Sequence, residues 1–566
     1  MTAGSMRLGR RIDPSGPIFV GLALFLVLLI GMPMGWLVWH AFTDRTGAFT
    51  LANFAALATD PTMVDPFLAT MTIATSVGIG CCVVAAPMGW LVARTDMPGR
   101  RFVRTLVTAS FVTPPFLGAV AWEILAAPNS GMINQWWRWA TGADPFDHLV
   151  DIYTLPGVVF VIACYTFPYV FVLVANALDR IPGDLEDASA ILGARAAHTA
   201  RRITIPLAMP AILAGSLVAF LQAMTLFGTP AILAMPAGFH TLTTKLWTLF
   251  QYPPKPGLAA ATALPLLIIT VTLLRTQAWI LGRRGYTVVG ARNSDPRRVR
   301  LGWLRVPALL LCLAVLCCPV FLPYAALVKA SLVRTVSDAL SLDTITLHNF
   351  RFVFLDFSAT RLAIRNTFIL CVAAATIGTL LALVIGYLAA RRAIRGSQFL
   401  GFLATAPIAI PGIVLGVGLF LAYTQPPLVL YGTLWILLMA YLTIELPGAY
   451  QQLQSAFRSI HPELEEASRI LGATRLQALA HVTAPLLRSG VVAAWCFIFI
   501  GTMRELSAAI LLFTANTKVL SVVVYDLNES GDLGAISVIG LTMLLITFGV
   551  VALANRLPGA ATAARG

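Results

Sequence analysis

The sequence predicts an all-α integral membrane protein of about twelve transmembrane helices. Of its 566 residues, 58% are hydrophobic and only 11% are charged, which is roughly half the charge of an ordinary soluble domain. Apolar runs of about 20 residues recur along the chain, each long enough to cross a bilayer as a helix. Strand-like alternation is absent, which argues against a membrane barrel. The expected spans are 17–43, 67–93, 105–126, 155–178, 208–235, 258–282, 305–328, 366–390, 399–423, 428–455, 489–514 and 534–555.

The placement of charge predicts how these spans are oriented. If all twelve cross and the N-terminus lies inside, the inner segments hold 28 arginines and 10 acidic residues, whereas the outer segments hold 10 basic and 12 acidic residues. This asymmetry follows the rule that basic residues stay on the cytoplasmic side. It places both termini in the cytoplasm. It also explains the net charge of +14 without a nucleic-acid partner.

The chain contains an internal duplication. Residues 185–207 and 464–486 align without a gap and are identical at 11 of 23 positions. We therefore expect a first half at 1–282 with a repeated loop at 180–207, a cytoplasmic linker at 283–304, and a second half at 305–566 with the loop at 459–486. Since six spans separate the two copies, the halves should have parallel topology and a pseudo-twofold axis along the membrane normal.

Each repeated loop predicts a short amphipathic helix on the cytoplasmic face. In the first copy the apolar residues share one helical face. Glu186 and Asp187 lie in the first turn, where the helix dipole favours acids, and Gly193 can end the helix. The second copy has the same features at Glu465, Glu466 and Gly472. Such a helix either packs under its own bundle or meets a partner. Its occurrence at two equivalent places favours a twofold-related partner.

The loop resembles the EAA loop of binding-protein-dependent ABC importer permeases. That pattern is E-A-A, three residues, G, nine residues and I-x-L-P, and both copies keep its spacing. The first copy reads Asp187-Ala188-Ser189, Gly193 and 203–206, and the second reads Glu466-Ala467-Ser468, Gly472 and 482–485. The departures are conservative in size: Asp for Glu in the first copy, Ser for the second Ala in both, and small apolar changes before the proline.

This resemblance implies the type I fold of ABC importers, with two six-helix halves. It implies that each loop is a coupling helix that docks on an ATPase subunit. The resemblance implies that this interface includes the motif residues Asp187, Ala188, Gly193, Glu466, Ala467 and Gly472. Glu186 and Glu465 should either form salt bridges there or face water.

The resemblance also implies partners. The chain has no GxxxxGK[ST] phosphate-binding loop, so we expect no enzymatic activity and no bound cofactor. ATP and Mg²⁺ should bind to a separate ABC ATPase, present in two copies per chain. A periplasmic solute-binding protein and a location in the bacterial cytoplasmic (inner) membrane are implied as well.

Four ionisable residues within the spans are candidates for the solute pathway, because such residues are costly in lipid and face the bundle interior. They are Arg504, Glu505, Glu445 and Glu123. For each, a structural salt bridge between bundles is the alternative role. Neighbours on a helix do not face each other, so Arg504 and Glu505 should each have a partner elsewhere. No cluster in the sequence marks a metal site.

The solute is suggested only by resemblance. Segments 226–252 and 504–527 look most like those of ferric-iron importer permeases, with thiamine, phosphonate and polyamine importers as related alternatives. A secondary transporter also has twelve spans and related halves, but it would need a coupling-ion site and no ATPase, which the duplicated loop argues against. A membrane enzyme would need a catalytic motif such as HExxH, and none is found.

Overall fold

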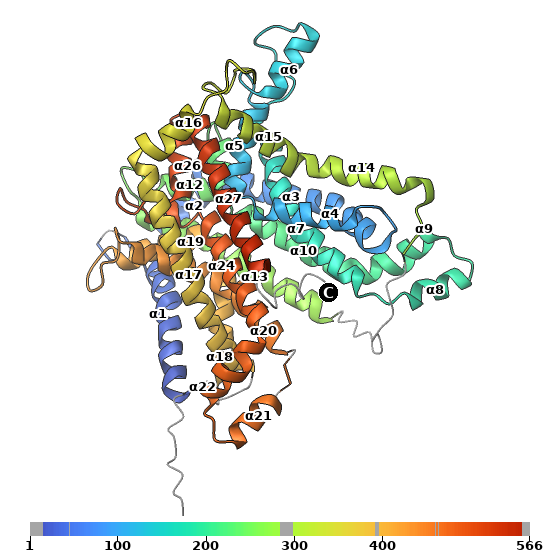
Figure 1. Cartoon of the computed structure of the whole chain (residues 1–566). Helices are drawn as coiled ribbons and strands as arrows, with labels where there is room; N and C mark the ends of the chain where they lie inside the picture. Colours follow the sequence, from blue (N-terminus) through green and yellow to red (C-terminus); the bar gives the residue numbers. More distant parts are fainter. Residues whose placement is uncertain are drawn as a thin grey trace, which may run out of the picture.

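The computed structural model describes residues 15–44, 46–283, 298–390, 396–458, 460–461 and 463–556 (Figure 1). Across these ranges the chain is helical, and β-structure is limited to three isolated bridges. The prediction of an all-α protein is confirmed. The predicted linker at 283–304 falls mostly on residues 284–297, which lie outside the described part.

The helices of the first half carry the labels α1 to α13. Their bounds are α1 (Ser15–Ala41), α2 (Ala52–Thr59), α3 (Pro61–Arg94), α4 (Arg100–Val112), α5 (Pro115–Ala126), α6 (Met132–Thr141), α7 (Leu155–Asp179), α8 (Asp184–Ile191), α9 (Ala196–Thr199), the π-helix η1 (Ala200–Thr204), α10 (Ile205–Thr225), α11 (Gly228–Leu233), α12 (Leu242–Thr248) and α13 (Pro256–Arg283).

The helices of the second half continue the numbering. Their bounds are η2 (Gly302–Leu304), α14 (Arg305–Leu316), η3 (Cys317–Phe321), α15 (Leu322–Leu332), α16 (His348–Arg351), η4 (Phe352–Asp356), α17 (Ser358–Ala390), α18 (Ser397–Thr405), η5 (Ala406–Ala409), α19 (Gly412–Tyr423), α20 (Leu434–Arg458), α21 (Glu463–Ile470), α22 (Arg475–Ala478), η6 (Leu479–Thr483), α23 (Ala484–Leu486), α24 (Arg488–Arg504), α25 (Ala509–Leu512), α26 (Leu520–Glu529) and α27 (Leu533–Arg556).

The described residues form eight helices that are long and apolar enough to cross a membrane, or up to eleven if each of three bent helix pairs counts as one span. These candidates correspond to eleven of the expected spans. The remaining one, 428–455, overlaps the 25-residue helix α20, which is not among the eleven. The chain is thus a multi-pass membrane protein, and the count of twelve stays a prediction.

Two spans expected as continuous helices are sharply bent, which corrects the prediction for 105–126 and 399–423. The first consists of α4 and α5 at 97°, and the second of α18–η5 and α19 at 106°. Pro114 and Pro411 stand at the two bends, each just before the second helix of its pair. Proline lacks a backbone N–H and disfavours helical geometry in the residue before it, so the helix stops and restarts in a new direction.

Two further spans end earlier than expected. The prediction of one continuous helix in each of the spans 208–235 and 489–514 was wrong, because α10 ends at Thr225 and α24 ends at Arg504. In each half the chain then turns into two short helices, α11 and α12 or α25 and α26. A hydroxyl from the second short helix ties the turn in the same way: Thr243 donates to the Leu226 carbonyl (2.9 Å) and Ser521 to the Glu505 carbonyl (2.8 Å).

The molecule has two arms that diverge from a common body (Figure 1). Helices α3, α7 and α10 pack together in one arm, and α17, α20 and α24 pack together in the other. The first helices are exchanged: α1 packs against α18 and α19 of the second half, while α14 and α15 pack against α4 and α5 of the first. The halves are therefore interlocked rather than laid side by side.

Candidate functional site

The two repeated loops have the same backbone. Helix α8 and helix α21 occupy positions 279 residues apart, and each is followed by a glycine in the left-handed region, Gly193 at φ +82° and Gly472 at φ +93°. In the first loop Gly193 N–H bonds to the Ala190 carbonyl and Ala194 N–H to the Ser189 carbonyl, and the second loop has the same pair of bonds. This pattern is a Schellman motif, which glycine favours because it lacks a Cβ atom.

A buried carboxylate anchors each loop to the span that follows it. Glu186 and Glu465 are each only 5% exposed. Glu186 accepts a hydrogen bond from the hydroxyl of Thr204 (2.7 Å), and Glu465 accepts one from Thr483 (2.8 Å). Both threonines end the π-helices that lead into α10 and into α23. Each loop helix is therefore tied to the membrane helix beyond it.

Arg94 completes the anchor in the first half. Its side chain is fully buried at the end of α3, and its Nη2 lies 3.0 Å from Glu186 Oε1. Its Nη1 also donates to the Ile181 carbonyl at 3.1 Å, just before α8. This corrects the expectation that Glu186 faces water or a partner subunit, because its carboxylate pairs inside its own half. Glu465 is equally buried. Sequence analysis had not singled out Arg94.

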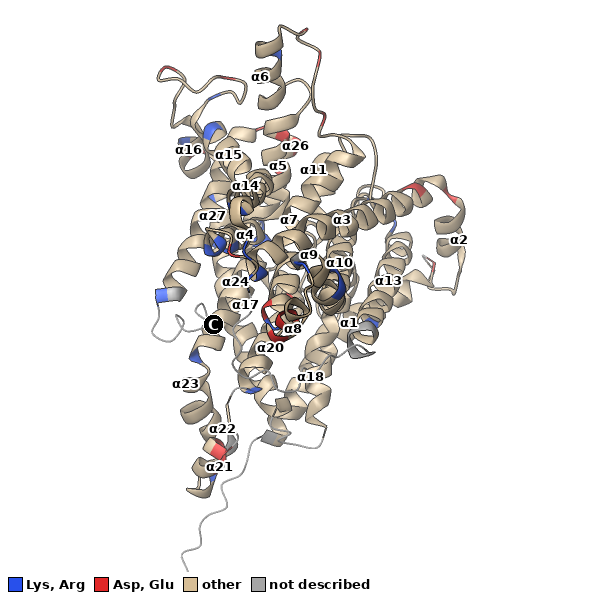
Figure 2. Cartoon of the chain, turned by 90° about the vertical axis from the view of Figure 1, so that its right-hand side faces the viewer, with Lys and Arg blue, Asp and Glu red and all other residues tan. Residues whose placement is uncertain are grey.

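The motif acids and alanines are exposed, and the helix tips are apolar. Asp187, Ala188, Glu466 and Ala467 all face outward. Beyond them, apolar side chains are exposed at matching positions: Ile191 (85%), Leu192 (87%), Ile470 (84%) and Leu471 (89%). Helices α8 and α21 lie at the ends of the two arms, well apart from each other (Figures 1 and 2). The molecule thus presents two equivalent apolar knobs on rigid, internally anchored helices.

The second candidate region is the turn after α24. Arg504 is the last residue of α24 and Glu505 is already extended, so the expectation that both lie within one helix was wrong. The Arg504 guanidinium lies 5.2 Å from the centre of the Phe111 ring and beside Tyr169. Phe111 and Tyr169 belong to the first half. Arg504 therefore reaches across to the other half, as a cation on the ring of Phe111.

The carboxylates of Glu505 and Glu445 lie within electrostatic reach of Arg504, and Glu505 lies within reach of Glu445. Glu505 accepts a hydrogen bond from the Ala508 amide at 2.8 Å. Glu445, on α20, packs with its carboxylate directly against Gly501 of α24, where a Cβ atom would force that carboxylate to move. The equivalent turn in the first half has Thr225 and Leu226, as the duplication predicts. The charged cluster is therefore one-sided, with both acids and the arginine from the second half.

Both regions lie within stretches of the chain that match a known family. The sequence pattern described as "Binding-protein-dependent transport system inner membrane component" matches residues 85–285 and 382–559. The chain belongs to this family. The two matched stretches fall one in each half, and each contains one repeated loop.

Similar proteins agree with this assignment. A "Ferric transport system permease protein FbpB" of Actinobacillus pleuropneumoniae is 25% identical over 78% of this chain and 63% of its own length. An "Fe(3+)-transport system permease protein FbpB 2" of Haemophilus influenzae is 22% identical over 92% of this chain and 95% of its own. A "Putative 2-aminoethylphosphonate transport system permease protein PhnV" of Salmonella paratyphi A is 27% identical over 27% of this chain and 58% of its own.

Glu123 is the fourth ionisable candidate of this inner membrane component. It joins the two halves at a place away from the turn after α24. Its two carboxylate oxygens accept hydrogen bonds from the Tyr153 hydroxyl and from the side-chain amide of Asn528, each at 2.8 Å. Asn528 lies on α26 of the second half. Glu123 is thus a bridge between halves, held by neutral partners instead of the cation that a salt bridge would need.

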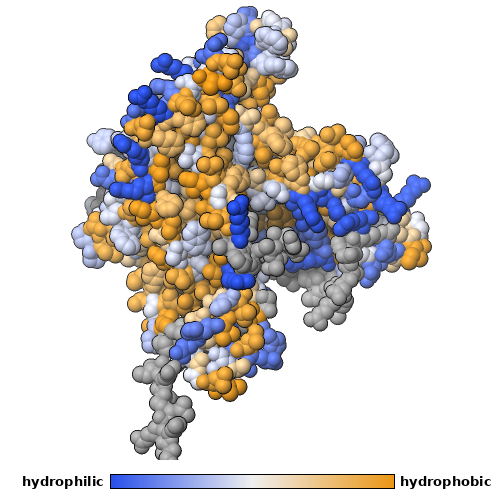
Figure 3. All heavy atoms as spheres, viewed as in Figure 1, coloured by the Kyte–Doolittle hydropathy of each residue, from blue (hydrophilic) through white to orange (hydrophobic). Residues whose placement is uncertain are grey.

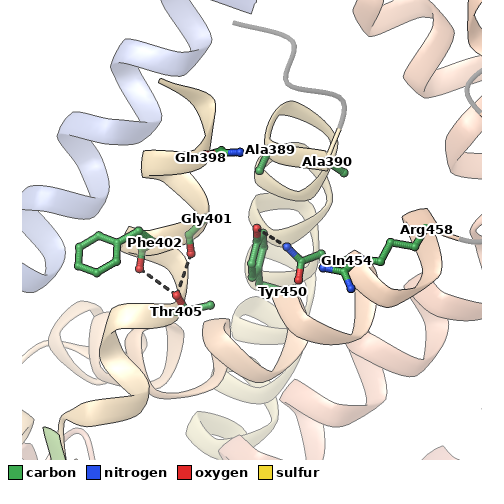
Figure 4. A pocket seen from close by; sticks show the side chains of 9 residues that line it. All are labelled: Ala389, Ala390, Gln398, Gly401, Phe402, Thr405, Tyr450, Gln454 and Arg458. Atoms are coloured by element: carbon green, nitrogen blue, oxygen red, sulfur yellow. Dashed lines mark hydrogen bonds between the residues drawn. The ribbon is translucent and has the colours of Figure 1, made fainter. Parts of the chain in front are cut away.

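Two further observations bear on binding sites. A pocket of about 450 Å³ lies between α17, α18 and α20, where Tyr450 accepts a hydrogen bond from Gln454 at 3.1 Å (Figure 4). None of the sequence-predicted site residues lines it. Within the described ranges, no three His, Cys, Asp or Glu side chains are grouped so that they could hold a metal ion.

Proposed function

We propose that this chain is the complete transmembrane part of an ATP-driven importer, with two permease halves fused in one polypeptide. The observation that carries the proposal is the pair of anchored loop helices with exposed apolar tips. An apolar knob on a rigid helix suits insertion into a cleft of a partner. Since there are two equivalent knobs on one chain, two copies of an ABC ATPase subunit would bind, one to each arm.

The hydrogen bonds of the two loops provide a route by which movement of the ATPase subunits would reach the membrane helices. When α8 is displaced, the Glu186–Thr204 hydrogen bond pulls on η1 and so on α10, which ends at Thr225. When α21 is displaced, Glu465 and Thr483 pass the movement through η6 into α24, which ends at Arg504. Both routes lead from a loop to a turn within the membrane. Closure of the two ATPase subunits would thus move both turns together.

ATP and Mg²⁺ would bind to the ATPase subunits, and this chain would bind neither. The charge asymmetry supports an orientation with both termini and both loops in the cytoplasm of a bacterial cell. The chain would then lie in the inner membrane, with the opposite face open to a periplasmic solute-binding protein.

Ferric iron is the solute that the relatives favour, since two of those described above are named for ferric transport. The pathway would run past the one-sided cluster of Arg504, Glu505 and Glu445, where a charged solute meets fixed charges in a low-dielectric setting. A phosphonate is a second candidate solute, because one relative is named for 2-aminoethylphosphonate transport. Thiamine and polyamines remain alternatives. A secondary transporter is disfavoured because it has no use for two docking knobs.

Uptake of labelled ferric iron, with the other importer components present, tests this proposal. Deletion of the chain should abolish uptake, and the wild-type chain should restore it. Gly472→Arg should fail to restore uptake although the protein reaches the membrane, because its long charged side chain replaces a left-handed glycine beside the docking tip. Gly142→Arg is the matched control, since Gly142 also has φ above zero and open space around it but ends α6, away from both loops.

The two parts of the proposal fail separately. Unchanged iron uptake in the deletion strain would reject iron and direct the search to phosphonates, thiamine and polyamines. Full transport and ATPase binding by Gly472→Arg would reject the docking role of the loops. Purification of the permease with a stably bound ATPase would reject the secondary transporter.

A further inference from the structure

Arginines converge at the point where the second half joins the first. Among the described residues, three come from the start of α4 and three from the segment around η2, and two acidic side chains lie among them. The arginines are Arg100, Arg101, Arg104, Arg298, Arg300 and Arg305, and the acids are Asp96 and Asp179. These eight described side chains together carry four more positive than negative charges.

Backbone hydrogen bonds hold the two segments against each other. The Asp96 amide donates to the Val299 carbonyl (3.1 Å), and the Val299 amide donates to the Arg94 carbonyl (2.8 Å). The Leu301 amide donates to Asp96 Oδ1 at 2.9 Å. Residues 298 and 300 therefore cannot move away from the start of α4 without breaking this backbone clasp. The fold keeps like charges together.

Both acids of the region already have partners. Asp96 accepts from Nε of Arg305 at 2.9 Å, and Asp179 accepts from Nη2 of Arg104 at 2.7 Å. Arg100 lies within electrostatic reach of Arg298 and of Arg104. We call the other four arginines, Arg100, Arg101, Arg298 and Arg300, the arginine cluster. Asp179 and Asp96 also lie within electrostatic reach of Arg100, but each is already bonded to another arginine, so the positive excess favours an external anion.

The surroundings of the cluster place it at the surface of a bilayer. Trp303 is 84% exposed, and the side chains of Val306 and Leu310 on the next helix are each 58% exposed. Exposed apolar residues on a span face lipid tails, whereas tryptophan prefers the boundary with water. Basic residues gather around α4 and α14 (Figure 2), next to the apolar flank of that arm (Figure 3). The cluster thus lies at headgroup depth, on the side that we propose is cytoplasmic.

We propose that the arginine cluster binds the headgroup of an anionic phospholipid, with Arg100 and Arg298 nearest to its phosphate. Guanidinium groups suit phosphate oxygens because they donate two parallel hydrogen bonds. Basic pockets between membrane helices at this depth are typical sites for acidic lipids. Lipid bound there would neutralise the junction of the two halves and brace the clasp. This proposal does not depend on which solute is carried.

Native mass spectrometry of the purified full chain tests the proposal. The chain is incubated with equal amounts of phosphatidylglycerol and phosphatidylcholine with the same acyl chains. Both contain phosphate, but only the first has a net negative charge. We expect preferential retention of phosphatidylglycerol. In the Arg100→Gln, Arg298→Gln double variant its affinity should fall about 30-fold, from roughly 1 kcal/mol per arginine.

Two sets of variants serve as controls. Arg100→Lys with Arg298→Lys keeps the charge and should retain most of the lipid binding, which separates loss of charge from loss of fold. Arg334→Gln with Arg361→Gln removes two exposed arginines that we place on the opposite face, and it should leave binding unchanged. Equal loss in this second pair would mean that the attraction is general and would overturn the proposal.

Two other results would also overturn it. If inorganic phosphate alone displaced the lipid completely and stabilised the chain equally well, the cluster would be a site for free anions. If the glutamine variant kept its lipid but lost the ATPase subunits, the cluster would belong to the protein interface.

Discussion

Replacing Arg94 by methionine should release α8 from its own half. The Arg94 side chain is fully buried and that of Glu186 is 6% exposed, with 3.0 Å between Nη2 and Oε1. Removing one partner of such a pair leaves an uncompensated buried charge, which costs about 3–5 kcal/mol. The lost hydrogen bond to the Ile181 carbonyl adds about 1 kcal/mol. The free energy needed to open α8 locally should fall by the sum of these two contributions. If the sum exceeds the opening free energy of the wild type, α8 should be open all the time.

Hydrogen exchange of residues 184–194 measures this effect directly, with the permease in lipid nanodiscs. The matched control is Arg104→Met, because Arg104 and Asp179 also form an ion pair, at 2.7 Å, but their side chains are 41% and 34% exposed. An exposed pair contributes about 0–1 kcal/mol. Protection of α8 should therefore collapse in Arg94→Met and change little in Arg104→Met.

A double-mutant cycle with Glu186→Gln completes the experiment. Once the buried charge is gone, the loss of Arg94 should matter less, so the double variant should be better protected than Arg94→Met alone. Additive effects in the cycle would refute our account of the pair. The same conclusion would follow if Arg94→Met and Arg104→Met lost equally little protection.

The remaining predictions concern other parts of the molecule. Gly193→Ala should lower the stability of the first loop by about 1–2 kcal/mol through backbone strain alone, and Gly193→Asn should lower it less. Hydrogen exchange of residues 190–194 would measure both effects. Alanine at both Arg504 and Glu505 should abolish uptake and coupled ATPase activity, and normal values would remove them from the pathway. Glu123→Ala should lower the melting temperature, since it removes the hydrogen bond from Tyr153 and the bond between halves from Asn528, worth about 1–3 kcal/mol together. Bonds from Arg305 and the Leu301 amide lower the pKa of Asp96 to about 2, so they hold the clasp closed above about pH 4. After correction for the intrinsic rate, hydrogen exchange of the amides of residues 299–301 should rise only as the pH falls from about 4 towards 2.

Local patterns predicted much of this structure. The apolar runs located the spans, and the duplication located both loop helices and the equivalence of Thr225–Leu226 with Arg504–Glu505. The bends at Pro114 and Pro411 were missed although prolines marked them, because hydropathy alone does not distinguish a straight span from a bent one.

The contacts that build the site were beyond the reach of such patterns. Arg94 had been counted only as an inner-face charge, yet it is the partner of Glu186. Tyr169 and Phe111 surround Arg504 from the other half of the chain. These pairings depend on how spans pack, and neither periodicity nor spacing within one segment carries that information.

The exchanged first helices have a consequence for biosynthesis. Helix α1 is made before two of the helices that it packs against, α18 and α19, which follow several hundred residues later. At about 5–20 residues per second, α1 waits on the order of 20 to 70 seconds in the membrane without these two neighbours. During that time lipid must cover the face that α19 will occupy. A half-length product could pair α1 with α13 of its own half, but the face for α18 and α19 would stay covered by lipid.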